Sequence, residues 1–399
     1  MRKELLEQSR PAATRPRPVP FYDGSRSFLE LWPRLRDHLN ELMDAGKYSH
    51  GIKVQELEEA AARYTGARHA IGVGNGTDAL ILLLRAAGIG PGDEVVVPCF
   101  SFVASATSVV HARARPVLVD VDPDTYALDP EAVAAAIGPR TKAIMPVHLF
   151  SQLADMDALG ELSDRTGVPL VEDSAEAIGM WWDGVHAGLL GVGGVLSFFP
   201  TKTLAAIGDA GMILTDDDAI ADRARILRHH GRLGTTVGRI SGISNVAGAS
   251  GTNSKMDEVQ AAVVLARLER LPEAIARRAA LARRYDRGLA DLEGLVKTPT
   301  IVPRRAATNP VFYVYLVEAE RKPELVAHLT ERGIETEEYY PRPLHLQPCF
   351  RDLGHREGDF PVAERACRRT LALPLYPDMP DEDVDVVCAA LHEFYAGVA

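Results

Sequence analysis

The sequence predicts an α/β fold with a mostly parallel central sheet and a smaller α+β domain at the C-terminal end. Two observations predict it. Between residues 69 and 215, short apolar segments alternate with segments of helical length, as in chains of strand–helix units. The apolar segments are nearly continuous and lack the polar alternation of a sheet with one wet face, so helices are expected on both faces.

The elements follow in a regular order. Helices are expected at 27–40 and 53–64, before the sheet begins. Strands are expected at 69–73, 94–98, 116–120, 143–148, 169–173, 195–199 and 212–215, with helices between them at 78–87, 103–112, 130–137 and 156–166. A long helix from Asp257 to about Leu289, broken or kinked at Pro272, leads to a strand at 312–317, a helix at 323–332 and a last helix from Asp381.

The 399 residues are enough for two domains with sizeable cores. We divide the chain into an N-terminal arm and helix (1–50), a large domain (51–270) and a small domain (271–399). The Gly/Ser/Thr-rich segment 231–252 interrupts this order as a long loop, and long loops inside compact domains are usually functional or mobile.

Composition excludes several classes of protein. The 46% apolar and 25% charged residues are typical of a globular protein, and the net charge of −11, without a Lys/Arg block, argues against binding nucleic acid. Neither the polar N-terminus nor any later segment has the apolar run of a signal peptide or membrane span, so a cytoplasmic enzyme is expected. The cysteines at 99, 349, 367 and 388 lack metal-binding or disulfide spacing and are expected to be reduced.

Lys202 is the first candidate for chemistry. It is one of eight lysines, and it alone directly follows an apolar strand and lies among small residues. Such surroundings can partly desolvate an amine, and desolvation lowers its pKa, as nucleophilic carbonyl chemistry requires. The alternative is a surface lysine in a turn, because lysines are mostly exposed.

Asp173 and the glycine-rich segment Gly74-Asn-Gly-Thr77 also follow predicted strands. Burying a carboxylate at the end of a strand is unfavourable unless a cation pairs with it, and a protonated pyridine nitrogen would be such a cation. The alternative for Asp173 is that it caps the next helix. In the glycine-rich segment, close backbone approach and free N–H groups at a helix start favour a phosphate. The alternative there is an ordinary N-cap by Thr77 or Asp78.

Phe102 follows the strand that ends at Pro98, where its ring can lie over a flat heterocycle or pack in the core. Together, an anion site, a stacking ring, a carboxylate and an amine at strand ends suit one ligand, pyridoxal 5'-phosphate. The carboxyl ends of parallel strands meet at one edge of a sheet, so we expect these groups to form one site. The sequence has no zinc-binding cluster, Gly-x-Ser-x-Gly elbow or Walker-type loop.

Eight ordered stretches extend this pattern along most of the chain: Gly74-Asn-Gly-Thr-Asp-Ala-Leu80, Pro91-Gly-Asp-Glu-Val-Val-Val-Pro-Cys-Phe-Ser-Phe102, Pro146-Val-His-Leu149, Ala154-Asp-Met-Asp157, Glu172-Asp-Ser-Ala-Glu-Ala177, Ser197-Phe-Phe-Pro-Thr-Lys202, Gly251-Thr-Asn-Ser-Lys-Met-Asp257 and Tyr339-Tyr-Pro-Arg-Pro-Leu-His-Leu-Gln347. With them, the chain from about Tyr48 to Met379 resembles the DegT/DnrJ/EryC1/StrS family of sugar aminotransferases. The resemblance implies the aspartate-aminotransferase-like fold of fold-type-I pyridoxal phosphate enzymes, with the cofactor in the large domain.

The resemblance also implies catalytic roles. Lys202 would form the Schiff base with the cofactor and then move the proton between the substrate carbon and C4′ of the cofactor. Asp173 would pair with the pyridine nitrogen, and Phe102 would stack on the ring. Relatives that dehydrate their substrate carry His in place of this lysine, so Lys202 favours transamination.

The remaining implied roles concern the phosphate and a second subunit. The backbone of Gly76 and Thr77, with the hydroxyls of Thr77 and Ser197, would hold the phosphate. Asn253 would reach the phosphate bound by the neighbouring subunit, so the active sites would be shared within a homodimer. The loop 231–252 would then lie near the partner's site.

Two positions depart from the family pattern. At Glu176 many relatives carry Gln, which binds near the cofactor's phenolic oxygen, and an acidic group there disfavours an anionic oxygen unless it is protonated or turned away. The loop before Asn253 is longer than usual and lacks the common aromatic-His segment, which affects the part of the site that faces the substrate.

The implied substrates are a keto sugar linked to a nucleotide and glutamate as amino donor. The Phe-Phe-Pro-Thr-Lys202 form, Gly208-Asp-Ala-Gly211 and Tyr340-Pro-Arg-Pro-Leu-His345 are most similar to the branch that aminates C3, which predicts a dTDP-3-keto-6-deoxyhexose. Tyr340 and His345 become candidates for substrate contact, with a satisfied loop histidine as the alternative for His345. A 4-keto sugar, a keto-cyclitol of the scyllo-inosose type and a non-catalytic pyridoxal-phosphate-binding protein are the alternative functions.

Overall fold

The computed structural model describes residues 17–49, 51–233 and 246–397. Parts of the predicted arm (1–16) and of the predicted loop (234–245) lie outside the described residues. The helices are α2 (Ser25–Ala45), α3 (Ile52–Thr65), α4 (Gly76–Ala86), α5 (Val103–His111), α6 (Pro130–Ala136), α7 (Met156–Thr166), α8 (Asp218–Leu227), α9 (Glu258–Leu268), α10 (Leu271–Gly288), α11 (Lys322–Glu331), α12 (Pro361–Arg369) and α13 (Asp381–Ala396). The strands are β1 (His69–Val73), β2 (Glu94–Pro98), β3 (Arg115–Val119), β4 (Thr141–Ile144), β5 (Glu172–Asp173), β6 (Trp181–Trp182), β7 (Val185–His186), β8 (Gly194–Ser197), β9 (Gly211–Thr215), β10 (Val296–Lys297), β11 (Tyr315–Ala319) and β12 (Thr370–Leu373).

The central sheet is built from two ladders, β3-β2-β4 and β5-β8-β9-β1. Parallel bridges from Ile144 to Leu170 and from Val147 to Asp173 connect β4 to β5, so the ladders form one continuous sheet. Within it, β9 runs antiparallel to both of its neighbours, while β2 is parallel to β3 and β4, and β5 is parallel to β8. The predicted mostly parallel α/β sheet is confirmed.

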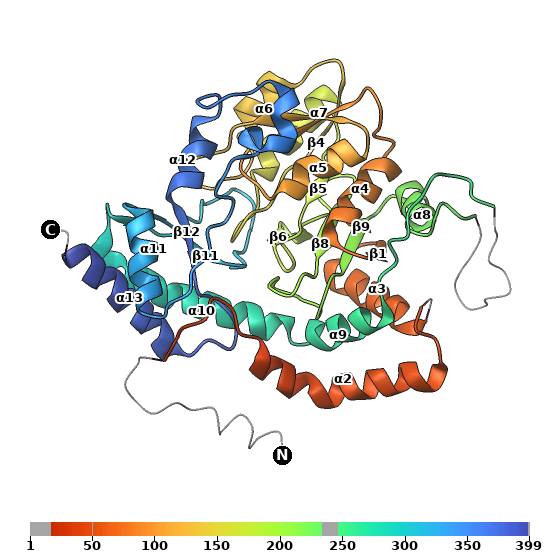
Figure 1. The fold of residues 1–399 in the computed structure, drawn as a ribbon. Coiled ribbons are helices and arrows are strands. Elements are labelled where there is room, and N and C mark those ends of the chain that lie inside the picture. The colour runs from red at the N-terminus through yellow and green to blue at the C-terminus, as the bar shows by residue number, and fades with distance from the viewer. Residues whose placement is uncertain (1–16, 50, 234–245, 398–399) are drawn as a thin grey trace.

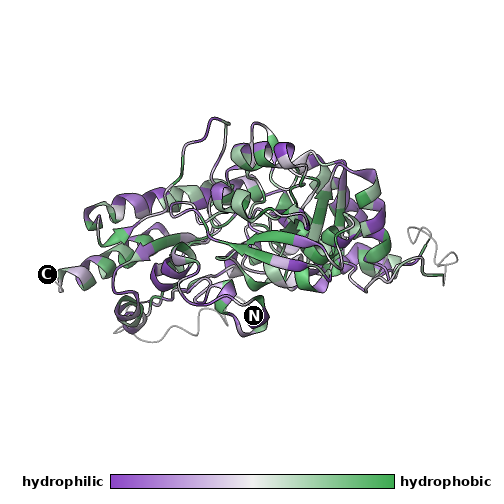
Figure 2. Ribbon diagram, turned by 90° about the horizontal axis from the view of Figure 1, so that it is seen from above, coloured by the Kyte–Doolittle hydropathy of each residue, from purple (hydrophilic) through white to green (hydrophobic). Residues whose placement is uncertain are grey.

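Helices cover both faces of this sheet (Figure 1). In β2, Val95 and Val97 pack in the cluster that contains α4 and α5, whereas Val96 packs with α6 and α7 on the opposite face. Successive side chains of a strand point to opposite faces, so a strand covered on both sides is apolar throughout. Full burial of one such side chain contributes about 1.5–3 kcal/mol. Figure 2 shows the strands as largely hydrophobic and the outer helices as mixed.

Two predicted strands are shorter than expected. The segment 143–148 forms a ladder only as far as Ile144, and the segment 169–173 only at Glu172–Asp173, with isolated bridges beside them. Each segment contains a proline, Pro146 or Pro169. Proline has no N–H to donate, so it interrupts a ladder in the middle of a sheet.

A second sheet, β10-β11-β12, is antiparallel and forms in the C-terminal part of the chain. It packs with α10, α11 and α13 around one apolar cluster. The predicted long helix is divided into α9 and α10, and Pro272 lies in the first turn of α10, where its missing N–H costs nothing. This agrees with the expected smaller α+β unit, while its boundary at residue 271 stays a prediction. In the described part of the chain, no helix is long and apolar enough to cross a membrane.

Candidate active site

The carboxyl ends of the parallel strands bring most of the predicted residues to one edge of the central sheet. β1 leads into the glycine-rich segment, β2 is followed by Phe102, β5 ends at Asp173, and β8 ends at Ser197 just before the turn with Lys202. These strands are parallel to one another, so their carboxyl ends share an edge.

Lys202 lies in a turn in which its N–H donates to the carbonyl of Phe199 at 2.8 Å. Its Nζ is 3.0 Å from Glu176 Oε1 and 4.3 Å from the centre of the Tyr313 ring. Burial by itself lowers the pKa of Lys202, but the Glu176 carboxylate, together with Tyr313, outweighs burial, and the pKa is raised. The expectation that desolvation lowers this pKa is therefore wrong for this arrangement, because a carboxylate lies against the amine.

Asp173 is buried at the end of β5. Its Oδ2 accepts a hydrogen bond from Ser105 Oγ at 2.8 Å, and its Oδ1 accepts from the N–H of Ala175 at 3.3 Å. Burial raises the pKa of Asp173, and the bond from Ser105 opposes this only in part. Among the residues that the structure describes, no cationic side chain forms an ion pair with Asp173. A protonated pyridine nitrogen would be the matching cation, so this carboxylate fits the predicted cofactor.

The start of α4 forms an anion cradle. Asn75 caps the helix, its side-chain oxygen accepting from the N–H of Asp78 at 2.7 Å, so the cap is neither Thr77 nor Asp78. In the described chain, the N–H groups of Gly76 and Thr77 have no acceptor. A Cβ atom at Gly76 would lie 2.9 Å from Ser197 Cβ, so only glycine lets α4 approach β8 this closely. Free amides beside a hydroxyl fit a phosphate.

Phe102 is exposed by 57%, which excludes the core-packing alternative. It is the N-cap residue of α5, and its ring centre is 6.4 Å from that of Tyr340. The hydroxyl of Tyr340 donates to Glu176 Oε1 at 3.3 Å, and Glu176 Oε2 accepts from the N–H of Phe150 at 2.9 Å. Glu176 is thus directed at Lys202, and its predicted role beside the cofactor's phenolic oxygen stays a prediction.

His345 is buried and bonded on both ring nitrogens. Nδ1 lies 2.9 Å from Cys99 Sγ, and Nε2 lies 3.1 Å from Glu364 Oε1. Burial lowers the pKa of His345, and the Glu364 carboxylate opposes the shift. These contacts are those of the satisfied loop histidine considered as its alternative. Of the two residues proposed to contact substrate, Tyr340 bonds to Glu176, the carboxylate that Lys202 contacts, and His345 lies in an interior network. Substrate contact by either residue stays a prediction.

Asn253 lies beside the anion cradle on a segment fixed to it. The carbonyl of Ser254 accepts from the N–H of Gly74 at 3.0 Å, and Ser254 Oγ donates to Asp78 Oδ2 at 2.6 Å. Asn253 itself is exposed, and its side-chain oxygen accepts from Lys255 Nζ. Its contact with a second subunit stays a prediction.

Two residues of the cluster were missed from the sequence. Tyr313 lies under the amine of Lys202, and Ser105 donates to Asp173. Ser105 lies three residues after Phe102 in the first turn of α5, so that spacing was a usable signal once the helix had been placed. Tyr313 comes from the distant segment before β11 and had no local signal.

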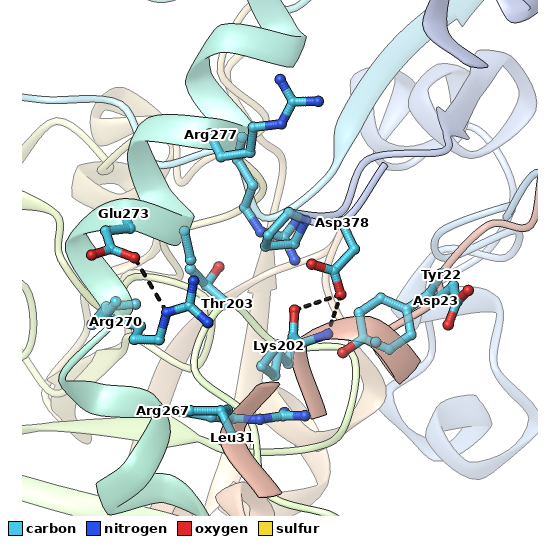
Figure 3. Close-up of a pocket in the computed structure, with 16 residues that line it drawn as sticks. Tyr22, Asp23, Leu31, Lys202, Thr203, Arg267, Arg270, Glu273, Arg277 and Asp378 are labelled. Atoms are coloured by element: carbon cyan, nitrogen blue, oxygen red, sulfur yellow. Dashed lines mark hydrogen bonds and ion pairs between the residues drawn. The ribbon is translucent and has the colours of Figure 1, made fainter. Parts of the chain in front are cut away.

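A cavity of about 210 Å³ adjoins Lys202 and Thr203 (Figure 3). Its other walls come from the segment before α2, from α2 itself, from the junction of α9 and α10, and from the segment before α13. Arg270 and Glu273 are paired across one side of it at 3.2 Å. Lys202 lines this cavity, whereas Asp173, Glu176 and Gly76 do not, so the cavity adjoins the predicted cofactor site only at the lysine.

The chain matches the DegT/DnrJ/EryC1/StrS aminotransferase family over residues 33–392. It is 42% identical over 378 residues to a pleiotropic regulatory protein of Geobacillus stearothermophilus, covering 94% of this chain and 98% of that one. It is 40% identical over 376 residues to the dTDP-3-amino-3,4,6-trideoxy-alpha-D-glucose transaminase of Streptomyces venezuelae, covering 94% and 96%. The crystal structure of S. venezuelae DesV in complex with a ketimine intermediate has a TM-score of 0.89 and 40% identity, covering 95% of this chain and 99% of that chain.

Proposed function

Because the chain belongs to the DegT/DnrJ/EryC1/StrS aminotransferase family, and is thereby a pyridoxal-phosphate-dependent sugar aminotransferase of fold type I, we propose that it aminates a nucleotide-linked keto-deoxysugar. The proposed substrate is a dTDP-3-keto-6-deoxyhexose, and the proposed amino donor is glutamate. The observation that carries the substrate assignment is the 40% identity, over 94% of this chain, to a relative named as a dTDP-3-amino-sugar transaminase.

Asp173 and the residues around it would hold the ring of the cofactor. The cofactor supplies an electron sink that accepts the electrons of the broken C–H bond. Asp173 would keep the pyridine nitrogen protonated, and Ser105 and the N–H of Ala175 orient its carboxylate for that task. Phe102, exposed beside the site, would cover one face of the ring and exclude water.

The anion cradle and Lys202 complete the proposed machinery. The free N–H groups of Gly76 and Thr77, with the hydroxyls of Thr77 and Ser197, would bind the phosphate and fix the position of the ring. Lys202 would remove the proton from the amino-bearing carbon of the donor in one half-reaction, and would deliver a proton to the carbonyl carbon of the sugar in the other. Its position at 3.0 Å from Glu176 keeps the amine at the centre of the cluster.

We further propose that two chains share their active sites in a homodimer. Phe199 and Ile207 lie on either side of Lys202 in the sequence and are exposed by 49% and 47% in this single chain. Together with the exposed ring of Phe102, they place large apolar side chains near the site, and such surfaces usually mark an interface. Asn253 would then act on the partner's phosphate.

A substrate panel tests the proposal. The purified enzyme should change from the pyridoxal to the pyridoxamine spectrum with glutamate, and then aminate a dTDP-3-keto-6-deoxyhexose to a product identified by mass and NMR. Turnover of only a 4-keto sugar nucleotide, or only of scyllo-inosose, would reassign the substrate. Borohydride should fix the cofactor on wild-type protein, and trapping that survives Lys202→Ala would show that another lysine binds it.

A further inference from the structure

The carboxylate of Glu176 is fixed on both oxygens by donors from distant segments. Oε2 accepts from the N–H of Phe150, and Oε1 accepts from the hydroxyl of Tyr340. Both donor residues have left-handed backbones, with φ of 63° at Phe150 and 53° at Tyr340. This conformation costs a non-glycine residue about 1–3 kcal/mol and persists where the surrounding structure enforces it, often at functional sites. The fold therefore holds this carboxylate in one orientation.

The aromatic surroundings are fixed in the same way. The rings of Phe150 and Tyr340 lie 6.0 Å apart, and Tyr339 packs edge-on against both of them. The hydroxyl of Tyr313 lies 3.0 Å from that of Tyr339 and 3.1 Å from Thr201 Oγ1. The Tyr313 ring is therefore held beneath the amine of Lys202.

Lys202 places its amine against the Glu176 carboxylate and the Tyr313 ring. Its amine lies 3.0 Å from Glu176 Oε1 and over the Tyr313 ring, and both contacts favour an ammonium over a neutral amine. Asp173 also faces the amine and acts in the same direction.

We infer that Glu176, held by Phe150 and Tyr340, is the binding partner of the Lys202 amine in the cofactor-free enzyme, and that it keeps the amine there as an ammonium. Glu176 is thus a positioning residue that acts through Lys202, in addition to any contact it makes with the cofactor. The inference rests on the proposed role of Lys202 as the Schiff-base lysine, but not on the identity of the sugar.

The inference has a consequence for bond formation. An ammonium must lose one proton before its nitrogen can attack an aldehyde carbon, and one water then leaves as the C–N double bond forms. Removing the carboxylate charge increases the neutral fraction of Lys202 at neutral pH, because the remaining effect of burial also disfavours the ammonium. Glu176→Gln should therefore speed the reaction of Lys202 with an aldehyde at neutral pH.

The test uses the apoenzyme and a covalent readout. Pyridoxal phosphate is added for short, fixed times between pH 6 and 9, borohydride stops the reaction, and peptide mass spectrometry measures the label on Lys202. For Glu176→Gln we expect labelling about tenfold faster at pH 7, with the two rates converging at high pH. Glu364→Gln, which removes a buried carboxylate bonded to His345, is the matched control and should keep the wild-type pH profile.

Each outcome decides a separate point. If the labelling rate of Glu176→Gln depends on pH as in wild type, or if its profile moves to higher pH, the inferred role of Glu176 is wrong. Label that persists after Lys202→Ala overturns the assignment of Lys202 instead. If Glu176→Gln does not fold, Glu176→Asp tests the same idea. Its side chain is one methylene shorter, which moves the carboxylate away from the Lys202 amine, so the labelling profile should move to lower pH by a smaller amount.

Discussion

Replacement of Asp173 by Asn should weaken cofactor binding without weakening the fold. The carboxylate is buried, accepts from Ser105 and Ala175, and forms no ion pair in the described part of the chain. A hydrogen bond to a charged partner contributes about 1.5–3 kcal/mol, so losing the contact with a pyridinium should raise the Kd for pyridoxal phosphate about 10- to 150-fold. The amide nitrogen of Asn donates and cannot accept, so one of the two donors loses its acceptor, which costs the apoenzyme about 1 kcal/mol. Removing a buried charge stabilises the folded state by about 1–3 kcal/mol, so the free energy of unfolding of the apoenzyme should rise by about 0–2 kcal/mol.

The pH dependence of unfolding gives this prediction a definite sign. Burial raises the pKa of Asp173 in the folded chain above its value in the unfolded chain. The folded state therefore binds more protons than the unfolded state between these two values, and the free energy of unfolding falls as the pH rises through that window. The stability that Asp173 contributes is present below the unfolded-state pKa and is lost as the pH rises through the folded-state pKa. Asp173→Asn should remove this part of the slope.

The assays are a fluorescence titration with pyridoxal phosphate and urea unfolding of the apoenzyme at several pH values. Glu258→Gln is the contrasting variant, because Glu258 is buried and accepts from the N–H groups of Gly51, Lys53 and Val54 at 2.7, 2.8 and 3.1 Å. It should lose about 1–3 kcal/mol of stability and keep its cofactor affinity. A Kd that changes less than twofold in Asp173→Asn, or an apoenzyme destabilised as much as Glu258→Gln, would refute our account of Asp173.

Three further predictions concern the anion cradle, His345 and Phe102. Gly76→Ala places a Cβ 2.9 Å from Ser197 Cβ, so the cradle must open, and we expect at least a tenfold loss of pyridoxal phosphate affinity in the same titration. His345→Ala removes the buried hydrogen bonds to Cys99 and Glu364, so the free energy of unfolding in urea should fall by about 2–4 kcal/mol. The kcat of the folded enzyme should stay within about threefold of wild type. A large fall in kcat at unchanged stability would instead support a contact between His345 and the substrate. Phe102→Ala should weaken cofactor binding and leave stability within about 0.5 kcal/mol, because the ring is exposed; destabilisation above 1 kcal/mol would contradict this.

The strand ends of the fold were predictable because their signals are local. A buried strand covered on both faces must be apolar along its whole length, so Glu94–Pro98 could be recognised without knowledge of its neighbours. Asp173 and Ser197 then followed at the carboxyl ends of parallel strands. The short ladders near Pro146 and Pro169 could also have been predicted, because proline cannot donate a hydrogen bond to a ladder. The apolar pattern of these two segments was given too much weight, so the predicted strands were too long.

The pKa of Lys202 was predicted with the wrong sign for a physical reason. Small neighbours in the sequence indicate burial, and burial alone does lower the pKa of an amine. The sign is reversed by Glu176, which lies 26 positions away in the sequence and 3.0 Å away in space. A charge partner of this kind appears only when the chain is folded, so local sequence could predict the desolvation but not the electrostatic contact that exceeds it.

The same distinction explains why the cofactor is easier to predict than the substrate. Each group that fits pyridoxal phosphate comes directly after a strand of the central sheet. The carboxyl ends of these strands share one edge of the sheet, so the sheet alone brings the groups together. The surroundings of the Lys202 amine come instead from two parts of the chain. Phe150 and Glu176 belong to the central-sheet part, and Tyr313 and Tyr340 reach them only through the packing of the C-terminal part against that sheet. Substitutions that change the substrate without loss of the cofactor should therefore concentrate in these converging segments. A change in packing between the two parts moves Tyr313 and Tyr340 relative to Lys202 while the strand ends keep their positions.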